Sequence, residues 1–279
     1  MLDDIDVLAI KTGMLRDEAT IQVVASTLKK YHRETPLRLV CDPVRVSALG
    51  DALLLDSAVG PLIDEILPLA TLITPNKSEA ELILLHRRKL KATISSLADM
   101  ISASKELLTL GPKAVLLKGG SVTTMAEVRE LVGTNPGIIV SKYGLLDENM
   151  NVLQVGLGES DRTSHLVVDV LQCSVGAGGE VETWIFVRPR IESLSTRGAG
   201  CTLSAAIVCG LANGLTGNYP PPFFVPLWRL IAVGSVPQAV LNGTIHTHLG
   251  ILHAFPVGAG RGPLNHVHSV VSRSVPRWV

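Results

Sequence analysis

The sequence of 279 residues has no bias toward charge of either sign, because 25 Lys and Arg side chains balance 25 Asp and Glu side chains. A chain without net charge lacks the long-range field that draws a protein to nucleic acid or to an anionic membrane. We therefore expect no nucleic-acid partner and no membrane partner. A small molecule is the favoured ligand.

Cysteine is scarce, and it does not occur in a pattern that would bind metal or form disulfides. The four cysteines are far apart and include no CxxC pair: Cys41, Cys173, Cys201 and Cys209. Small disulfide-rich domains and zinc knuckles need closer and more regular spacing. The pattern is typical of a reducing compartment, and we predict a cytoplasmic location.

The sequence also lacks the apolar runs of targeting and membrane segments. Its start at Met1 has neither the basic residues nor the apolar run of a signal peptide. The most apolar late stretch, residues 222–241, is interrupted by Arg229, Gly234 and Pro237. That stretch is too short and too interrupted to span a bilayer.

Aromatic residues make up only 4% of the chain, although 47% of it is hydrophobic. The core must therefore consist of Leu, Val, Ile and Ala, which suit buried parallel strands covered by helices. Short apolar runs predict strands at 7–10, 37–41, 71–74 and 114–117. Helical patterns lie between them at 17–31, 56–67, 78–85 and 94–110. This alternation predicts an α/β fold with a parallel, doubly wound sheet.

The alternation stops between about residues 123 and 182, which are rich in Gly, Asn and Ser. We interpret this stretch as an insertion of irregular strands, with β-like runs at 137–140 and 165–171. A strand at 184–187, a helix at 201–215 and a helical region at about 224–252 follow it. We predict one domain over residues 1–268 and a tail over 269–279.

The strongest chemical signal is the segment RGAGCTLSAA at residues 197–206. Two glycines, Gly198 and Gly200, stand where a strand gives way to a helix, and backbone N–H groups at a helix start bind anions. A thiol in the first turn of such a helix is favoured as thiolate. Cys201 is thereby placed to take a proton from a substrate hydroxyl. The alternative is a tight turn followed by a buried cysteine, and this segment alone does not decide between the two.

A second signal, TPNKSE at residues 74–79, follows a predicted strand directly. Open α/β sheets bind their ligands at the carboxyl ends of strands, and a carboxylate such as Glu79 can organise Mg²⁺ there. The alternative is helix capping, because Ser78 with Glu81 three residues later matches a capping box. Capping by Ser78 would leave Glu79 free for a metal.

Two weaker signals lie at the ends of other predicted strands. Lys118 leaves a strand into the turn Gly119–Gly120, where it can reach a nucleotide phosphate or simply face solvent. Asp42 precedes Pro43 and is either a partner of Mg²⁺ through water or a turn former. Five histidines crowd the last third of the chain, but no Cys or acid stands at ligand spacing beside them, so we predict no metal site there.

Taken in order, these segments resemble the hydroxymethylpyrimidine/phosphomethylpyrimidine kinase family of the ribokinase superfamily, in its fungal form. The matching residues are 10–15, 42–44 with Gly50 following, 68–79, 111–120, 198–206 and 262–266. The resemblance covers nearly the whole chain except the insertion, which looks like the extended loop of fungal members. It implies a ribokinase-like three-layer αβα fold with a mostly parallel central sheet.

The resemblance also raises an expectation about the two ends. Family members have a Gly-rich segment and several strands before the Gly-Met-Leu motif, which here stands at residues 13–15. Fungal relatives continue past the last motif into a further domain. We therefore expect a kinase domain that lacks its N-terminal strands and is truncated at both ends.

The family uses MgATP to phosphorylate 4-amino-5-hydroxymethyl-2-methylpyrimidine, and then the resulting monophosphate, in thiamine biosynthesis. The resemblance implies that Cys201 is the catalytic base and that Gly198, Ala199 and Gly200 form the anion hole.

Further roles follow from the same resemblance. Lys118 and Gly120 would contact ATP, and Asp42 and Glu79 would organise Mg²⁺. The cofactors that the resemblance implies are therefore ATP and Mg²⁺, and a homodimer is left open.

Met14 and Val44 would line the pyrimidine pocket by the same resemblance. The chain departs from the family at Arg45, where the family has Met, and at Arg197 and Ala199, where it has His and Thr. Two alternatives remain, a catalytically inactive remnant that binds nucleotide and a pyridoxal kinase. Pyridoxal kinases more often have Asp at the position of Cys201.

Overall fold

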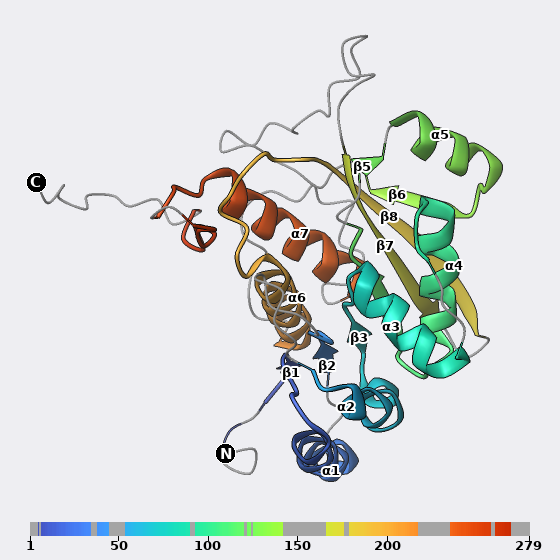
Figure 1. Cartoon of the computed structure of the whole chain (residues 1–279), viewed down its shortest axis with the longest axis vertical. Coiled ribbons are helices and arrows are strands. Elements are labelled where there is room, and N and C mark those ends of the chain that lie inside the picture. The colour runs from blue at the N-terminus through green and yellow to red at the C-terminus, as the bar shows by residue number, and fades with distance from the viewer. Residues whose placement is uncertain are drawn as a thin grey trace, which may run out of the picture.

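Eight strands form one mixed sheet at the centre of a computed structural model (Figure 1). The structure describes residues 5, 7–34, 38–44, 54–89, 93–119, 122–123, 125–141, 166–175, 179–216, 235–257 and 260–268. Four neighbouring strands run parallel, in the order β1 (Ala9–Thr12), β2 (Arg38–Cys41), β3 (Leu72–Ile73) and β4 (Ala114–Leu117). These are the four strands predicted for the first half of the chain, and β4 has the predicted bounds.

Helices connect the parallel strands and cover one face of the sheet. They are α1 (Glu18–Glu34), α2 (Asp56–Pro61), α3 (Lys77–Arg88) and α4 (Leu97–Leu108). Successive strand residues point to opposite faces. On β4, Val115 and Leu117 accordingly belong to the core beneath these helices, whereas Ala114 and Leu116 pack on the other face.

The helix predicted at 56–67 is helical throughout but changes its hydrogen-bond pattern. After α2 the chain forms a π-helix, η1 (Leu62–Ile66), and then a 3-10 turn, η2 (Leu67–Leu69). Pro61 and Pro68 lie in these segments and lack the N–H that a regular helix requires. The prolines therefore account for the interruption.

The stretch 123–182 contains more regular structure than the sequence predicts. It includes the helix α5 (Met125–Thr134) and the strand β6 (Ile138–Ser141), and β7 (Leu166–Val175) lies between β4 and β8 (Glu180–Pro189). A short strand, β5 (Val122–Thr123), also pairs with β7. The β-like runs predicted at 137–140 and 165–171 are confirmed as β6 and β7, whereas the helix α5 was not predicted. Residues 142–165 are outside the described part.

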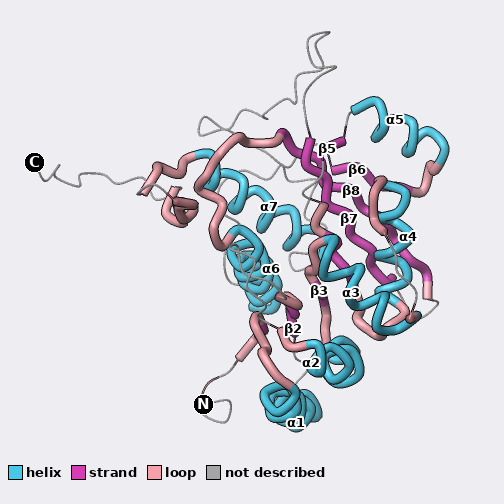
Figure 2. The backbone as a smooth tube through the Cα atoms, viewed as in Figure 1, coloured by secondary structure: helices cyan, strands magenta, loops and turns pink. Residues whose placement is uncertain are grey.

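Strand β7 reverses the direction of the sheet. It is antiparallel to both β4 and β8, and β8 in turn pairs in parallel with β6. The sheet is thus parallel at its β1–β4 side and mixed beyond β4, as Figure 2 allows the reader to trace.

The second face of the sheet is covered by α6 (Ala199–Thr216) and α7 (Val236–Leu252) (Figure 1). These two helices approach closely at glycines. A Cβ atom at Gly243 would lie 2.7 Å from Cγ1 of Ile207, so a side chain there would force the helices apart. The two helix layers around the sheet confirm the predicted three-layer αβα fold. No helix in the described part of the chain has the length and apolar character needed to cross a bilayer.

Candidate functional site

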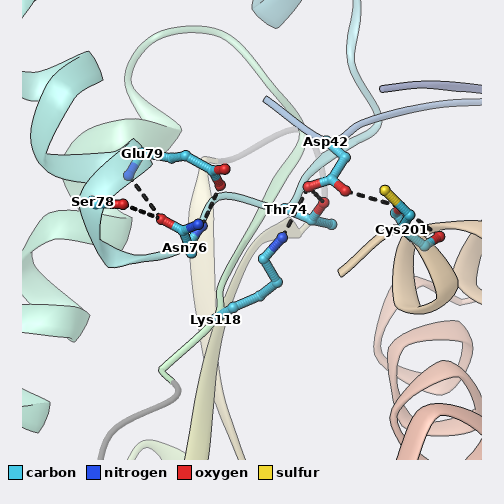
Figure 3. A network of polar contacts seen from close by, with 8 residues as sticks. Asp42, Thr74, Asn76, Ser78, Glu79, Lys118 and Cys201 are labelled. Atoms are coloured by element: carbon cyan, nitrogen blue, oxygen red, sulfur yellow. Dashed lines mark hydrogen bonds and ion pairs between the residues drawn. The ribbon is translucent and has the colours of Figure 1, made fainter. Parts of the chain in front are cut away.

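Three of the four parallel strands bring polar residues to one edge of the sheet. Asp42 follows β2, Thr74 follows β3 and Lys118 follows β4. Because the strands are parallel, their carboxyl ends meet at the same edge, where open α/β folds bind ligands. The first turn of α6 arrives at that edge from the second face of the sheet (Figure 3).

Asp42 is the centre of a hydrogen-bonded group that we call the Asp42 cluster: Asp42, Thr74, Lys118 and Ser204. Its Oδ1 accepts from the Lys118 ammonium at 2.9 Å and from the Thr74 hydroxyl at 3.1 Å. Its Oδ2 accepts from the Ser204 hydroxyl at 3.2 Å. The cluster joins residues from three strand ends and from α6 (Figure 3).

The Asp42 cluster is largely removed from solvent. Asp42 is 1% exposed, and the side chain of Lys118 is 16% exposed. A buried charge is tolerated only when it is paired and hydrogen-bonded, and this carboxylate has three donors. The arrangement holds the ammonium of Lys118 in one place and leaves a small part of the side chain exposed.

Gly200 allows α6 to begin against this cluster. A Cβ atom at Gly200 would lie 3.3 Å from Nζ of Lys118 and 3.9 Å from Oδ2 of Asp42. A side chain in this position would therefore require the ammonium or the helix start to move by a few tenths of an ångström. Gly198 has φ of 85°, a left-handed conformation that favours glycine, and it turns the chain into the helix.

The start of α6 offers backbone amides to an anion, although not all of those predicted. The amide of Thr202 donates to Gly198 O at 2.8 Å, which is the first bond of the helix. The amide of Ala199 donates to Thr196 O at 3.2 Å, so that predicted member of the anion hole is already engaged. The amides of Gly200 and Cys201 come next, in the turn where a helix has no carbonyl to offer them.

Cys201 lies in the first turn of α6 and is exposed. Ser204 connects it to the Asp42 cluster, because the hydroxyl of Ser204 also approaches Cys201 O at 3.1 Å (Figure 3). The thiol is therefore not the buried packing residue of the alternative interpretation. A groove of about 920 Å³ begins at Cys201 and runs between α6 and α7 past Asn242 and His246.

The C-terminal segment of the resemblance, residues 262–266, supports the start of α6. The amide of Arg197 donates to Gly262 O at 3.1 Å, and Arg197 forms an isolated bridge with Pro263. The hydroxyl of Thr202 lies 2.9 Å from Nε2 of His266. The last described segment thus fixes the loop and the first turn that carry Cys201.

Glu79 is held differently from the prediction. The helix α3 is capped by Asn76, not by Ser78: Oδ1 of Asn76 accepts from the amide of Glu79 at 2.9 Å. In the reciprocal hydrogen bond, Oε2 of Glu79 accepts from the amide of Asn76 at 2.7 Å. The carboxylate predicted to be left free is therefore part of the capping box itself.

Three predicted residues remain: Met14, Val44 and Gly120. Met14 follows β1 and is 53% exposed, and Val44 lies half-buried two residues after Asp42. Both stand at the carboxyl ends of neighbouring parallel strands, at the same edge as the Asp42 cluster. Gly120, predicted to contact ATP, lies outside the described residues.

The structure adds site residues that sequence reasoning missed. Ser204 and Thr74 complete the shell of Asp42, and His266 supports Thr202. The position of Ser204, one helical turn after Cys201, was the available signal, because it sets both residues at the beginning of the same helix. Nothing local to Thr74 or His266 indicates these partners.

The oxygen ligands at this edge suit Mg²⁺. That ion prefers carboxylates and usually keeps several waters while binding substrate phosphates. Asp42 and Glu79 supply carboxylates, and each already accepts hydrogen bonds from the protein. No group of three or more His, Cys, Asp or Glu residues arranged for a metal ion occurs among the described residues. The residues thus fit an ion held mainly through water and phosphate.

Comparison with known proteins places the chain in a family. The profile described as phosphomethylpyrimidine kinase matches residues 1–151. The hydroxymethylpyrimidine/phosphomethylpyrimidine kinase of Rhizobium meliloti is 30% identical over 268 residues, which are 96% of this chain and 74% of the relative. The Streptomyces coelicolor protein of the same name is 30% identical, covering 95% of this chain and 71% of the relative.

Solved structures agree on the fold. Bacillus subtilis pyridoxal kinase in an ADP complex has a TM-score of 0.62 and 24% identity, covering 96% of this chain and 72% of that one. Staphylococcus aureus pyridoxal kinase with pyridoxal has a TM-score of 0.58 and 20% identity, covering 94% and 68%. These likenesses confirm the ribokinase-like fold, and the sequence matches identify its branch. The chain is a member of the phosphomethylpyrimidine kinase family.

Proposed function

We propose that this protein transfers the γ-phosphoryl group of MgATP to the hydroxymethyl group of 4-amino-5-hydroxymethyl-2-methylpyrimidine, and then phosphorylates the monophosphate. The observation that carries the proposal is the convergence of Cys201, the amides at the start of α6 and the Lys118–Asp42 pair at one sheet edge. These groups are a base, an anion site and a fixed cation. Phosphoryl transfer requires all three functions.

The start of α6 would bind the phosphoryl group during its transfer from ATP to the acceptor. The amides of Gly200 and Cys201 point outward from the helix terminus, where the macrodipole favours negative charge. Lys118, whose ammonium would lie 3.3 Å from a Cβ atom at residue 200, adds a positive charge next to the same place. Donors fixed before the reaction lower the barrier without reorganising during it.

Cys201 would act on the acceptor. Its thiolate takes the proton of the substrate hydroxyl while the hydroxyl oxygen forms a bond to the γ-phosphorus. The bond from that phosphorus to the β,γ-bridging oxygen breaks, and ADP leaves with the electron pair. The thiol then loses its proton to solvent, which its exposure permits.

Asp42 and Glu79 would hold a hydrated Mg²⁺ at the ends of β2 and β3. When bound, the ion neutralises charge on the nucleotide phosphates. The residues of the chain contribute by fixing oxygens at that edge, and Asp42 at the same time fixes Lys118.

Met14 and Val44 would contact the pyrimidine. The cytoplasmic location stays a prediction, as does the homodimer.

The proposal is tested with the purified chain in a coupled assay of ADP release, with the hydroxymethylpyrimidine and pyridoxal compared as acceptors. Turnover with the pyrimidine and not with pyridoxal is expected. Cys201→Ala should reduce kcat by about 10²–10⁴-fold, the usual contribution of a general base, and should leave ATP affinity nearly unchanged. Cys201→Ser should resemble it, because a hydroxyl is a poor base at neutral pH.

Cys209→Ala is the matched control, because Cys209 is also an exposed cysteine of α6. It should keep the parental kcat. Parental rates in both Cys201 variants would refute the assigned base. A folded chain that binds nucleotide without phosphorylating either acceptor would instead favour the inactive nucleotide-binding alternative.

A further inference from the structure

A buried ion pair lies behind Lys118, outside the residues assigned so far to the reaction. Asp169 of β7 is fully buried, and its Oδ2 accepts from the guanidinium of Arg188 on β8. Its Oδ1 accepts from the amide of Gly119 at 2.9 Å. One carboxylate thus joins a cation on one side to the residue that follows Lys118 on the other.

Gly119 is pressed against β7. A Cβ atom at this position would lie 1.7 Å from the carbonyl oxygen of Val168, a distance that no side chain can accommodate. The close approach brings the amide of Gly119 within reach of Asp169, the neighbour of Val168. The backbone at the end of β4 is therefore fixed by both shape and hydrogen bonding.

Lys118 is held from its other side as well. Its own amide donates to Pro75 O at 2.8 Å, at the end of β3. The backbone of Lys118 is consequently fixed between β3 and β7 before its side chain extends to Asp42. Long lysine side chains lose considerable rotamer freedom when they are ordered, and a fixed backbone reduces the number of conformations that Nζ can explore.

The charge behind this arrangement is balanced within the fold. Among the described residues, the one ion pair of Arg188 is with Asp169. His248 of α7 lies near Arg188 and is buried. Burial, and then the charge of Arg188, lower the pKa of His248 to about 4, so His248 is neutral near pH 7. His248 therefore adds no positive charge to the Arg188–Asp169 pair near pH 7.

We propose that Asp169, together with Arg188, is a positioning residue that sets the place of Lys118 in the site. Among the described residues, Asp169 bonds to Gly119 and Arg188 and to none of the groups assigned to the reaction, so it acts through the amide of Gly119. The inference rests on the proposed function, in which Lys118 serves the nucleotide phosphates. It assigns to the antiparallel part of the sheet a role in aligning a residue of the parallel part.

Two substitutions separate the parts of this interaction. Asp169→Asn keeps the size and an oxygen for the amide of Gly119, but it loses the charge that faces Arg188. Asp169→Leu removes both. Gln172→Leu is the matched control, because Gln172 is buried on the same strand and accepts a hydrogen bond from Thr183 of β8, away from Lys118.

Kinetics are the first readout. Displacing a group by about 1 Å can cost about 100-fold in rate, so Asp169→Leu should lower kcat/KM for ATP by roughly that factor. Asp169→Asn should lie between it and the parent protein. Gln172→Leu should lower the Tm but keep kcat/KM, which separates positioning from a general loss of stability.

Chemical labelling of Lys118 is the second readout and does not depend on activity. The folded proteins are treated with acetic anhydride, and acetylation of Lys118 is followed by mass spectrometry. Lys118 should react faster in Asp169→Leu than in the parent or in Gln172→Leu. If Asp169→Leu fails to fold, Asp169→Asn serves in both measurements. Faster labelling of Lys118 in Asp169→Leu, together with a parent protein that shows no turnover, would contradict the proposed function and support the inference. Labelling and kcat/KM equal to those of Gln172→Leu would overturn it.

Discussion

Asp42 and Glu79 lie after neighbouring strands, yet the chain holds their carboxylates in different ways. Glu79 accepts from the amide of Asn76, three residues away, within one turn of α3. Asp42 accepts from Thr74, Lys118 and Ser204, which are 32, 76 and 162 residues away. The first arrangement needs only a helix start. The second needs the completed sheet and α6. A substitution that breaks it should therefore displace residues from several segments of the site.

The substitution Asp42→Leu should have the largest effect, on both the free energy of unfolding and turnover. This change leaves the ammonium of Lys118 partly buried without its carboxylate, and breaking a buried pair typically costs about 3–5 kcal/mol. We expect the lower end of that range, because the side chain of Lys118 keeps 16% exposure. Turnover should fall by at least about 100-fold, since Lys118 and α6 lose their common partner. Denaturant unfolding and the ADP-release assay measure the two effects.

The double variant Asp42→Leu with Lys118→Met sharpens this prediction. Removing both charges should restore much of the unfolding free energy, because no uncompensated charge remains in the site. Activity should not return. A double variant as unstable as Asp42→Leu alone would show that packing, and not the unpaired ammonium, causes the loss.

Asn76→Ala should have a smaller effect that is confined to stability. Loss of an N-cap side chain costs about 1 kcal/mol, with a range of roughly 0.5–2. The bond from the Asn76 amide to Glu79 uses the backbone and survives the change, so turnover should be little altered. Thermal unfolding checks the first expectation. Asn76→Ser should recover most of the loss, whereas a large fall in kcat would mean that the cap is coupled to the chemistry.

The smallest effect should be a pH dependence of stability that arises in the N-terminal cap of α4. Asp99 closes a capping box with Ser96 at the start of α4, and hydrogen bonds from Ser95 and Ser96 lower its pKa to about 2. Its folded pKa lies below the unfolded value of 3.8, so its contribution is complete above pH 3.8. That contribution is lost as the pH falls toward 2.

Asp99→Asn should therefore flatten the acid side of the stability curve between about pH 4 and 2, as followed by denaturant unfolding at each pH. Above pH 5 the variant and the parent should unfold with parallel pH profiles. An unchanged acid slope would show that other carboxylates dominate this range. Such a result would assign acid unfolding to carboxylates other than Asp99.

The same contrast explains what the sequence could predict. Apolar runs located β2 and β4, and the glycines at 198 and 200 located the start of α6, because those signals lie within a few residues. The cap at α3 was assigned to Ser78 because its motif matched, but Asn76 offered an equally suitable side chain two residues earlier. Local patterns limited the candidates without deciding between them.

The partners of Asp42 could not be predicted, because they come from segments that meet only in three dimensions. The place of β7 in the sheet was missed for a similar reason. Its long buried strand adjoins residues 142–165, whose composition suggested an irregular insertion. The resemblance implies a place for Ala199 in the anion hole, but its amide donates to Thr196 O, and that bond depends on the exact path of the turn. Family resemblance indicates which residues to consider, whereas the contacts that join them required the structure.

The separation of 162 residues between Asp42 and Ser204 also affects the order in which the protein is completed. Contacts between distant segments form late, because closing the long loop between them costs conformational entropy before the contact itself can stabilise the chain. During synthesis, Asp42 and Lys118 are made long before α6 exists to join them. A nucleotide that binds at the start of α6 therefore stabilises only the finished fold. Ligand binding at this edge would thus report that the chain has completed folding.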